Sequence, residues 1–264
     1  MQPRDSVKRT LPLVLCAILL AQTGIANEPE KPQEDVLRPV RLQTYWGPVL
    51  LANFVMSSGE FVTTCDCLYD GGSGVGFGGG AFIQYPLTAS ISLLGQATLQ
   101  GLGAEYSDTE IRPEYVSTPN SEGSIEMLEF EKTANVTATY ILLDLRGMYE
   151  FGKSGVAISI GPAVGILVDD YIEESETLKT EGIIYGTNQQ TEKQFLDGGF
   201  DQLYEKETLR FALAFGLSYD IAFGRNMFIS PEISYHLPFT SLVGEYSDWK
   251  HASMQAGVRV KFGL

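Results

Sequence analysis

The chain has 264 residues and a formal net charge of −15 at pH 7, with 19% charged and 44% hydrophobic residues. So acidic a protein repels phosphate groups, which argues against nucleic acid as a partner. After residue 26 there is no stretch of about 18 or more uncharged apolar residues, which argues against helical spans of an inner membrane.

The first 26 residues have the pattern of a secretory signal peptide. Basic residues precede an apolar run over 11–21, and small residues suited to cleavage follow it. Residues 27–41 combine three prolines with acidic residues, which predicts a disordered periplasmic lead-in. We therefore expect an exported protein that folds as one domain over residues 42–264.

Eight segments of alternating hydropathy follow, and the connections between them are short and long in strict turn. The short connections fall near 86–89, 151–155 and 223–227. The long connections cover 58–73, 107–132, 170–206 and 238–248. All long connections then lie at one end of an up-and-down sheet. Bacterial outer-membrane barrels share this feature, because their periplasmic turns are short and their outer loops are long.

The clearest alternation runs over residues 209–221 and recurs over 251–262. In both segments the large apolar side chains share one face, and the charged and small side chains share the other. This division is expected where one side of a strand meets lipid and the other side meets a polar lumen. A soluble, lipocalin-like barrel is the alternative, and it would place the apolar side chains inside.

Glycine and proline mark special positions in the predicted strands. The glycines between Gly74 and Gly80 alternate along one face, which favours a narrow, strongly curved barrel over a phosphate-binding loop. Pro162 and Pro231 fall inside predicted strands, where a proline cannot donate a hydrogen bond to the neighbouring strand. We expect β-bulges or rim positions at these two prolines.

Aromatic residues gather near both ends of the predicted strands, as in the interfacial belts of a membrane barrel. The belt at the short-turn end comprises Trp46, Tyr85, Tyr149, Phe151, Phe223 and Phe228. The belt at the long-connection end comprises Tyr106, Tyr171, Tyr235 and Trp249.

Cys65 and Cys67 lie in the first long connection. Export places them in an oxidising compartment, so we expect a local disulfide across one intervening residue. An inert or externally reactive pair is the alternative. Two thiols without further ligands make a poor metal site, and we predict no metal.

The predicted lumen carries charges of both signs. An eight-stranded barrel is only just wide enough for side chains to fill, which argues against an open diffusion pore. We predict that the inward charges form a salt-bridged plug, because buried charges must be paired. A gated ion path through the plug is the alternative. The predicted charges are Asp144, Arg146, Arg210, Asp220, Glu232 and Arg259.

The sequence gives less support for a catalytic site in the lumen than for a salt-bridged plug. His236 shares a strand face with Ser234 and Glu232, but alternate residues on a strand lie roughly 6–7 Å apart at the backbone. A serine nucleophile needs direct hydrogen-bond contact with its histidine. We therefore assign no catalytic residue and no cofactor, and we keep a lipid-modifying enzyme as the remote alternative.

Several segments resemble the small outer-membrane barrels of the OmpA-like and PorT-like type. They are the CDC pair at 65–67, GSGVGFGGGAFIQYPL, GPAVG, PEISY and the closing strand. In such families the last strand carries a signal for the outer-membrane assembly machinery. The resemblance implies that Gln255, Gly257, Val260 and Phe262 carry it here, although Gly263 and Leu264 follow the aromatic residue.

The resemblance implies a free-standing barrel without the peptidoglycan-binding domain of many OmpA-like proteins. We expect an all-β, eight-stranded antiparallel up-and-down transmembrane barrel in the outer membrane of a Gram-negative bacterium, with both termini in the periplasm. Its expected role is structural or surface interaction, and its expected partners are outer-membrane lipid, lipopolysaccharide, the assembly machinery and an unidentified surface partner. A narrow, gated porin-like channel is the alternative function.

Overall fold

The computed structural model describes residues 42–62, 68–116, 124–152, 154–180, 192–200, 207–224, 226–242 and 249–264. The expected signal peptide, the lead-in and the pair Cys65 and Cys67 lie outside these residues. No helix in the described residues is long and apolar enough to cross a membrane.

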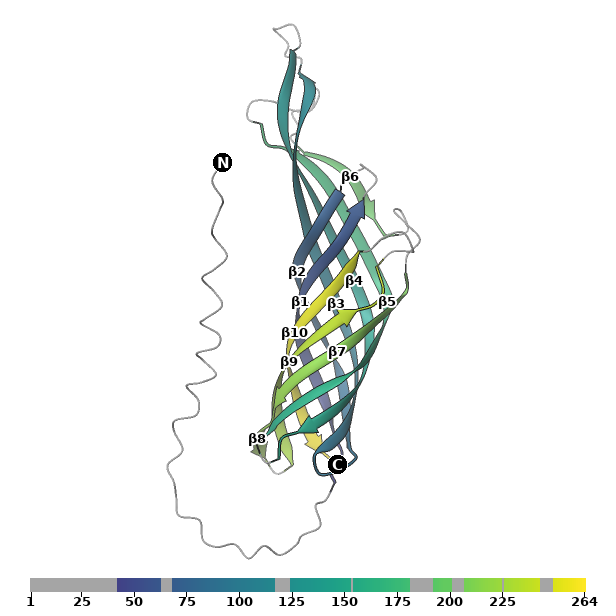
Figure 1. The fold of residues 1–264 in the computed structure, drawn as a ribbon, viewed down its shortest axis with the longest axis vertical. Helices are drawn as coiled ribbons and strands as arrows, with labels where there is room; N and C mark the ends of the chain where they lie inside the picture. The colour runs from purple at the N-terminus through teal and green to yellow at the C-terminus, as the bar shows by residue number, and fades with distance from the viewer. Residues whose placement is uncertain are drawn as a thin grey trace, which may run out of the picture. The chain divides into compact units, whose positions relative to one another are not determined.

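The described residues form ten antiparallel strands (Figure 1). They are β1 (Tyr45–Val62), β2 (Leu68–Pro86), β3 (Ile91–Val116), β4 (Ser124–Glu150), β5 (Val156–Leu178), β6 (Glu192–Gly198), β7 (Leu209–Tyr219), β8 (Ile221–Gly224), β9 (Met227–Pro238) and β10 (Lys250–Gly263). The strands pair in the order β1, β2, β3, β4, β5, β7 and β9, and β10 pairs with both β9 and β1 to close the ring. Since β7 and β8 share one place in the ring and β6 pairs only with β5, the barrel is eight-stranded and up-and-down, as predicted.

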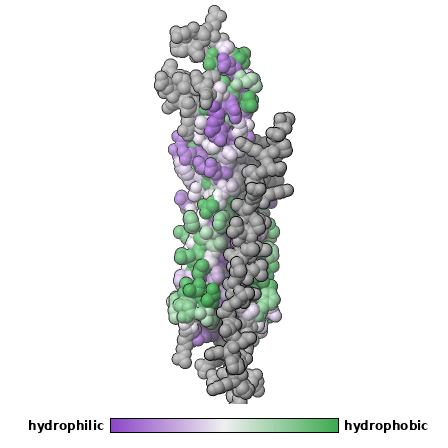
Figure 2. Space-filling model, turned by 90° about the vertical axis from the view of Figure 1, so that its left-hand side faces the viewer, coloured by the Kyte–Doolittle hydropathy of each residue, from purple (hydrophilic) through white to green (hydrophobic). Residues whose placement is uncertain are grey.

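The barrel wall exposes its apolar side chains and buries its charges. Leu50 and Phe77 are more than 70% exposed, whereas Arg146 and Arg259 are 1% exposed. Figure 2 shows the hydrophobic residues gathered around the lower body of the barrel. The predicted direction of the alternation is therefore confirmed, and the lipocalin-like alternative is wrong.

The short connections are tight turns. Gly152 and Gly155 have positive φ angles of 57° and 75°, and Asn226 has a φ of 63°. Glycine and asparagine adopt this left-handed region most readily, so these residues allow the chain to reverse within a few positions.

The long connections are shorter than predicted, because the strands continue into them. β3 and β4 stay paired from Ile91 opposite Tyr149 to Val116 opposite Ser124, through most of the expected loop at 107–132. β5 likewise continues to Leu178. Outside the apolar belt the contrast is reversed over much of these strands, because polar side chains such as Glu129 and Asn135 face outward while Phe130, Val136 and Ile172 are buried, so the pattern of a lipid-facing strand is lost there. We call the part formed by residues 105–116, 124–139, 169–178 and 192–198 the extension (Figure 1).

The two strand prolines cause gaps in the ladder, and the expected bulges or rim positions are wrong. The pairing of β4 with β5 skips Pro162 and resumes in the same register. Pro231 pairs with Val258 of β10, but the ladder toward β7 ends one residue away, at Glu232. The division between β7 and β8 falls at this point. A missing N–H therefore removes a hydrogen bond without inserting a residue.

The inward glycines of β2 allow β3 to lie unusually close. A Cβ atom built on Gly76 would lie 2.0 Å from the carbonyl oxygen of Gly101, and one built on Gly80 would lie 2.0 Å from that of Ala97. Across this corner the side chain of Asn53 on β1 donates a hydrogen bond to the carbonyl of Gly101 at 3.2 Å. The glycine stripe thus permits the strong curvature that was predicted.

Candidate functional site

A three-membered ion-pair cluster lies in the lumen. Glu232 on β9 accepts a hydrogen bond from Arg146 Nη1 of β4 at 2.5 Å, and its other oxygen lies 2.8 Å from Arg259 Nη2 of β10. Arg146 also donates to Gln96 Oε1 at 3.2 Å. Gly216 leaves the room for this cluster, because a Cβ atom there would lie 2.9 Å from Arg146 Nη1. One carboxylate therefore links two arginines across the lumen.

Asp144 lies beside this cluster without a direct hydrogen bond. Its Oδ2 atom is 3.7 Å from Arg146 Nη2 and 3.8 Å from His236 Nε2. Ser234, which shares the face of His236, instead donates a hydrogen bond to Gln255. Among the described residues the lumen thus contains an ionic network without a serine and histidine in hydrogen-bond contact.

The other two predicted lumen charges have separate partners. Arg210 donates to the backbone carbonyl of His251 at 2.7 Å and lies over the ring of Tyr140. Asp220 accepts hydrogen bonds from Ser230 and from Lys261, the latter at 2.7 Å. Four of the six predicted residues are therefore brought together, and two are held elsewhere.

Sequence reasoning missed Lys261 and Gln96. Lys261 has the inward parity of Arg259 on β10 but is not among the charges predicted for the plug. Gln96 carries no charge, so nothing in a search for ionised residues could select it. Both can be found from residue parity, that is, from whether a position is odd or even along its strand, because inward and outward positions alternate along β3 and β10.

An aromatic cluster fills the barrel at the end opposite the short turns. The Tyr106 hydroxyl lies within 2.7 Å of Ser57 Oγ, Trp249 Nε1 and His251 Nε2. Phe200 packs against Trp249 at 6.0 Å between ring centroids. The prediction that Tyr106 and Trp249 belong to an outer interfacial belt is therefore wrong. Both are fully buried; Tyr106 has the inward parity of β3, and Trp249, which comes just before β10, has the inward parity of that strand.

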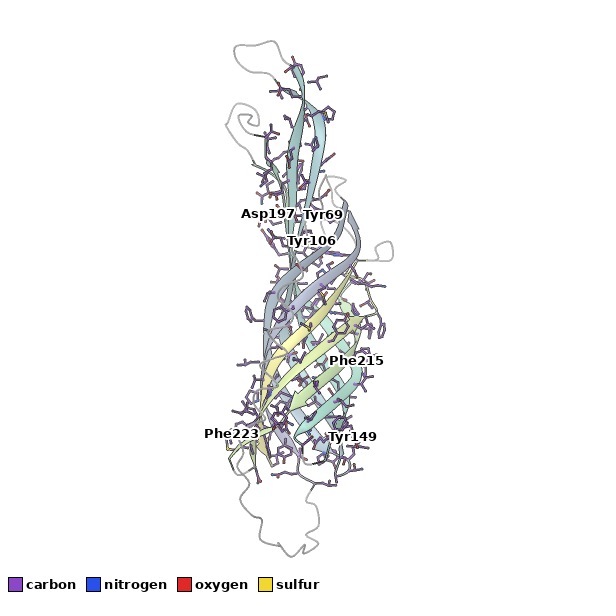
Figure 3. All side chains as sticks on the ribbon, turned by 60° about the vertical axis from the view of Figure 1, so that its left-hand side comes forward. Tyr69, Tyr106, Tyr149, Asp197, Phe215 and Phe223 are labelled. Atoms are coloured by element: carbon purple, nitrogen blue, oxygen red, sulfur yellow. The ribbon has the colours of Figure 1, made fainter. Side chains whose placement is uncertain are left out.

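Aromatic residues at the short-turn end do face outward. The exposed members are Trp46, Tyr85, Tyr149, Phe151 and Phe223, whereas Phe228 is half-buried. Figure 3 shows Tyr149 and Phe223 at this end, and Tyr69 and Tyr106 toward the other. One interfacial belt lies where it was expected, and at the other end only Tyr171 is clearly exposed among the residues named for that belt.

The extension has its own ionic network on the face that continues the lumen side. Arg112 on β3 donates to both oxygens of Glu176 on β5, at 2.8 and 2.9 Å, and to Glu114 at 2.9 Å. Its guanidinium also lies 4.0 Å from the centre of the Phe130 ring. Lys132 lies 2.6 Å from Glu110. These contacts tie three strands together beyond the apolar belt.

The network shifts the pKa values of two of its members. Burial lowers the pKa of Arg112. The hydrogen bonds to Glu176 and Glu114 and the charges of these two carboxylates together raise it by more, so the net result is a raised pKa. The hydrogen bond from Lys132 is the largest influence on Glu110 and lowers its pKa. Both groups are therefore held in their charged forms.

The residues of the expected assembly signal lie along β10. Gln255 points inward and donates to Gln100 at 2.8 Å. A Cβ atom on Gly257 would lie 2.3 Å from a methyl group of Leu51. Val260 and Phe262 are half-buried. Recognition of this strand by an assembly machinery stays a prediction. Within the described ranges, no group of three His, Cys, Asp or Glu side chains could hold a metal ion.

Comparison with known proteins gives no family model and no curated protein that matches the sequence. Among solved structures, the attachment invasion locus protein Ail of Yersinia pestis is 10% identical, with 84% of this chain and 100% of that one covered and a TM-score of 0.30. Neisserial surface protein A is 13% identical over 83% and 97%, with a TM-score of 0.32. The N-terminal β-barrel domain of Pseudomonas aeruginosa OprF is 16% identical over 82% and 98%, with a TM-score of 0.26. The architecture is established by the strand pairing itself.

Proposed function

We propose that this chain is an integral outer-membrane protein of a Gram-negative bacterium, with a closed lumen and a surface-interaction role carried by the extension. The observation that supports this most strongly is that the polarity of the wall is the reverse of that in a water-soluble protein. Large apolar side chains cover its outside while Arg146, Glu232 and Arg259 pair inside it. Such a wall is stable only with hydrocarbon around it.

The packed lumen favours an interaction role over a channel. Arg146, Glu232 and Arg259 are at most 6% exposed, whereas a water-filled path at their level would expose them. The aromatic cluster around Trp249 is equally buried at the far end. Neither a diffusion pore nor an enzyme is part of the proposal.

The short-turn end is the proposed periplasmic end. The backbone N–H of Leu264 donates to the carbonyl of Thr44, so the described ends of the chain meet there. Short periplasmic turns and long outer elements are the rule for such barrels. The extension then faces the cell exterior, and outer-membrane lipid, lipopolysaccharide and the assembly machinery are the expected partners.

Two experiments test the proposal. Refolded protein in planar bilayers should give no discrete conductance, and stable single-channel steps would contradict the closed lumen. An epitope inserted between Val116 and Ser124 should be labelled on intact cells, whereas one inserted between Phe151 and Gly155 should need permeabilised cells. Labelling of the second epitope on intact cells would contradict the orientation.

A further inference from the structure

The sheet of the extension has an open edge along β3. The pairing of β2 with β3 ends at Ser73 opposite Glu105. β3 continues to Val116, and over 107–115 the described residues give it one neighbour, β4. Figure 1 shows the β3–β4 hairpin rising past the ends of β1 and β2. A run of nine residues, about 30 Å of strand, therefore has a partner strand on one side only. We call this run the β3 edge.

The backbone groups that face the β3 edge can be identified from the barrel wall. A Cβ atom on the even-numbered glycines of β2 would contact the carbonyl oxygens of odd-numbered residues of β3, from Ala97 to Glu105. Since the N–H and C=O of one residue lie on the same side of an antiparallel strand, odd-numbered residues face β2 and even-numbered residues face β4. The β3–β4 register is unbroken up to Val116, so the same parity holds in the extension. The residues that face the open side are Ser107, Thr109, Ile111, Pro113 and Tyr115.

The position of Pro113 agrees with this assignment. Within sheets, proline occurs on edge strands with its nitrogen directed away from the neighbouring strand. The pairing of β3 with β4 continues through Pro113 opposite Met127, whereas the pairing of β4 with β5 skips Pro162. The β3 edge thus lacks one donor, and its other N–H and C=O groups on that side are available for pairing.

The β3 edge has little of the protection that natural edge strands carry. Short length, β-bulges and lysine side chains are the usual means, besides proline. Residues 107–115 contain no lysine, and they show no register shift against β4. The charges on the inward side are matched within the sheet, because Glu110 is paired with Lys132 and Arg112 with Glu114. The edge is therefore long, straight and selective for hydrogen bonding and not for charge.

Hydrogen-bonding geometry selects the occupant. Resting on the proposed surface role, we propose that the β3 edge binds an extended segment of another protein, which joins the sheet as an antiparallel strand. The pairing groups recur at every second residue, about 6.8 Å apart, and an extended chain has the same spacing. The added strand continues the interface that β2 makes with β3 along the barrel wall, where the pairing is also antiparallel.

The side chains of β3 specify the kind of segment. Ile111 and Tyr115 are 62% and 69% exposed on the outward face, and apolar pairs across neighbouring strands stabilise a sheet. The segment should therefore carry apolar side chains at alternate positions beside them. On the other face Glu110 and Arg112 already have partners, which suits uncharged polar side chains.

A second copy of the chain fits this edge less well. Two copies in one membrane point the same way, so their β3 edges would meet in parallel. Each copy also carries a net charge of −15, which opposes close approach. A lipid surface presents no row of amide groups at the spacing of a strand.

N-methylated peptides test the proposal on the refolded mature protein in zwitterionic nanodiscs, with empty nanodiscs as the blank. The probe is a labelled peptide of alternating valine and threonine with a polyethylene glycol tag, and fluorescence anisotropy measures its binding. With the valines beside Ile111 and Tyr115, the valine N–H groups face β3 and the threonine N–H groups face away. N-methylation of the valines should weaken binding at least about tenfold, and N-methylation of the threonines should change it less than about twofold. Equal binding of the two methylated peptides would overturn the proposal.

A pair of variants locates the site. Thr109→Pro removes an N–H that faces the β3 edge and places a ring there, while the bonds to β4 come from even-numbered residues. It should weaken binding of the unmethylated peptide at least about tenfold. Thr109→Val keeps the N–H and the branched shape, and it should bind within about twofold of the unchanged protein. Undiminished binding by Thr109→Pro would overturn the proposal.

Amide exchange of the unchanged protein tests the edge without any variant. In the absence of peptide, the amides of Ser107, Thr109 and Ile111 should exchange faster than those of Asp108, Glu110 and Arg112. The peptide should slow the first set. Slow exchange of the first set without peptide would show that the edge is not open, and the proposal would be wrong.

The other occupants are outcomes of the same tests. Self-association by light scattering that Thr109→Pro abolishes would overturn the proposal in favour of a second copy, and vesicle binding that it abolishes would do so in favour of lipid. The epitope labelling on intact cells keeps this inference apart from the proposed function. An extension that is labelled on intact cells but does not bind the valine–threonine peptide overturns only this inference.

Discussion

The barrel wall and the extension share strands but differ in what their outward faces carry. Along β4 the outward side chains Ile141, Leu143 and Leu145 give way to Thr139, Thr137 and Asn135 with no change of parity. The β3–β4 register is also unbroken across this boundary. Backbone pairing is thus continuous, and the surrounding medium sets the outward residue types. A single β-hairpin can therefore pass from a hydrocarbon-facing segment to a water-facing segment without a break in its hydrogen bonding.

The two regions also use their charges differently. The wall buries an arginine–glutamate–arginine cluster, whereas the extension keeps Arg112 and Glu110 partly exposed. Losing one member of a buried cluster leaves an uncompensated charge, but partly exposed groups can turn to water. Changes in the wall should therefore have global effects, and changes in the extension should have local effects.

The largest effect is expected from Glu232→Ala. This change leaves Arg146 and Arg259 facing each other in the lumen, and breaking a buried pair costs about 3–5 kcal/mol. Urea unfolding of the refolded protein in lipid should show the loss as a lower free energy of unfolding. The matched control, Glu129→Ala on the outward face of the extension, should shift that free energy by less than about 0.5 kcal/mol. Equal losses of unfolding free energy in the two variants would contradict the difference between buried charges in the wall and exposed charges in the extension.

The next effect concerns the curvature of the wall at β2. Gly76→Ala places a methyl group against the carbonyl of Gly101, and because that neighbour is backbone, the strands must separate. Overpacking of this kind costs about 1–3 kcal/mol. Gly79→Ala on the outward face meets the side chain of Leu50 at 3.3 Å and the carbonyl oxygen of Val49 at 3.5 Å, an ordinary contact distance, and should be tolerated. The thermal stability of the folded band on gels compares the two, and a tolerated Gly76→Ala would contradict the close approach of β3.

A smaller and local effect is expected in the extension. Arg112→Met removes the paired hydrogen bonds to Glu176 and the contact with Phe130. Local opening of β3 and β5 should become easier by about 1–3 kcal/mol, because hydrogen bonds to charged groups have that worth. Amide exchange should rise over 106–116 and stay unchanged over 91–101. Faster exchange in both segments would mean that the extension is not a separate unit.

The smallest effect depends on pH. The pKa of Glu110 is lowered in the folded protein, so its contribution to stability is complete above the ordinary glutamate value near 4.3 and is lost as pH falls through the folded value. NMR shifts of the Glu110 amide should therefore report a transition that lies below the ordinary glutamate value. Lys132→Met should move the midpoint upward. An unmoved midpoint would exclude Lys132 as the cause.

The sequence predicts the wall well and the extension poorly, for a physical reason. Over 209–221 and 251–262 one face meets hydrocarbon, so apolar and polar residues must alternate, and the strands can be read directly. Over 107–132 the apolar residues change face, from Ile125 and Met127 outside to Leu128 and Phe130 inside, and the segment resembles a loop although it forms a hairpin. Side-chain alternation reveals a strand only where the apolar residues keep to one face.

The candidate site was predicted in part. Charge and parity together identified the cluster around Glu232. They could not show that Arg210 donates its hydrogen bond to the backbone carbonyl of His251 and not to a carboxylate. Trp249 and Tyr106 were assigned to the surface because of their nearness to strand ends, although their parity indicates the interior. Partner choice depends on distances between strands far apart in sequence, which residue patterns do not contain.

The most direct measurement is the accessibility of spin labels in the refolded protein in lipid, with Cys65 and Cys67 replaced by serine. Labels at Phe211 and Phe215 should collide with dissolved oxygen and not with a water-soluble nickel complex, whereas labels at Ile125 should show the reverse. Labels at Ala212 and Ala214 should be shielded from both. Nickel contact at Phe211 and Phe215 would contradict a wall embedded in hydrocarbon.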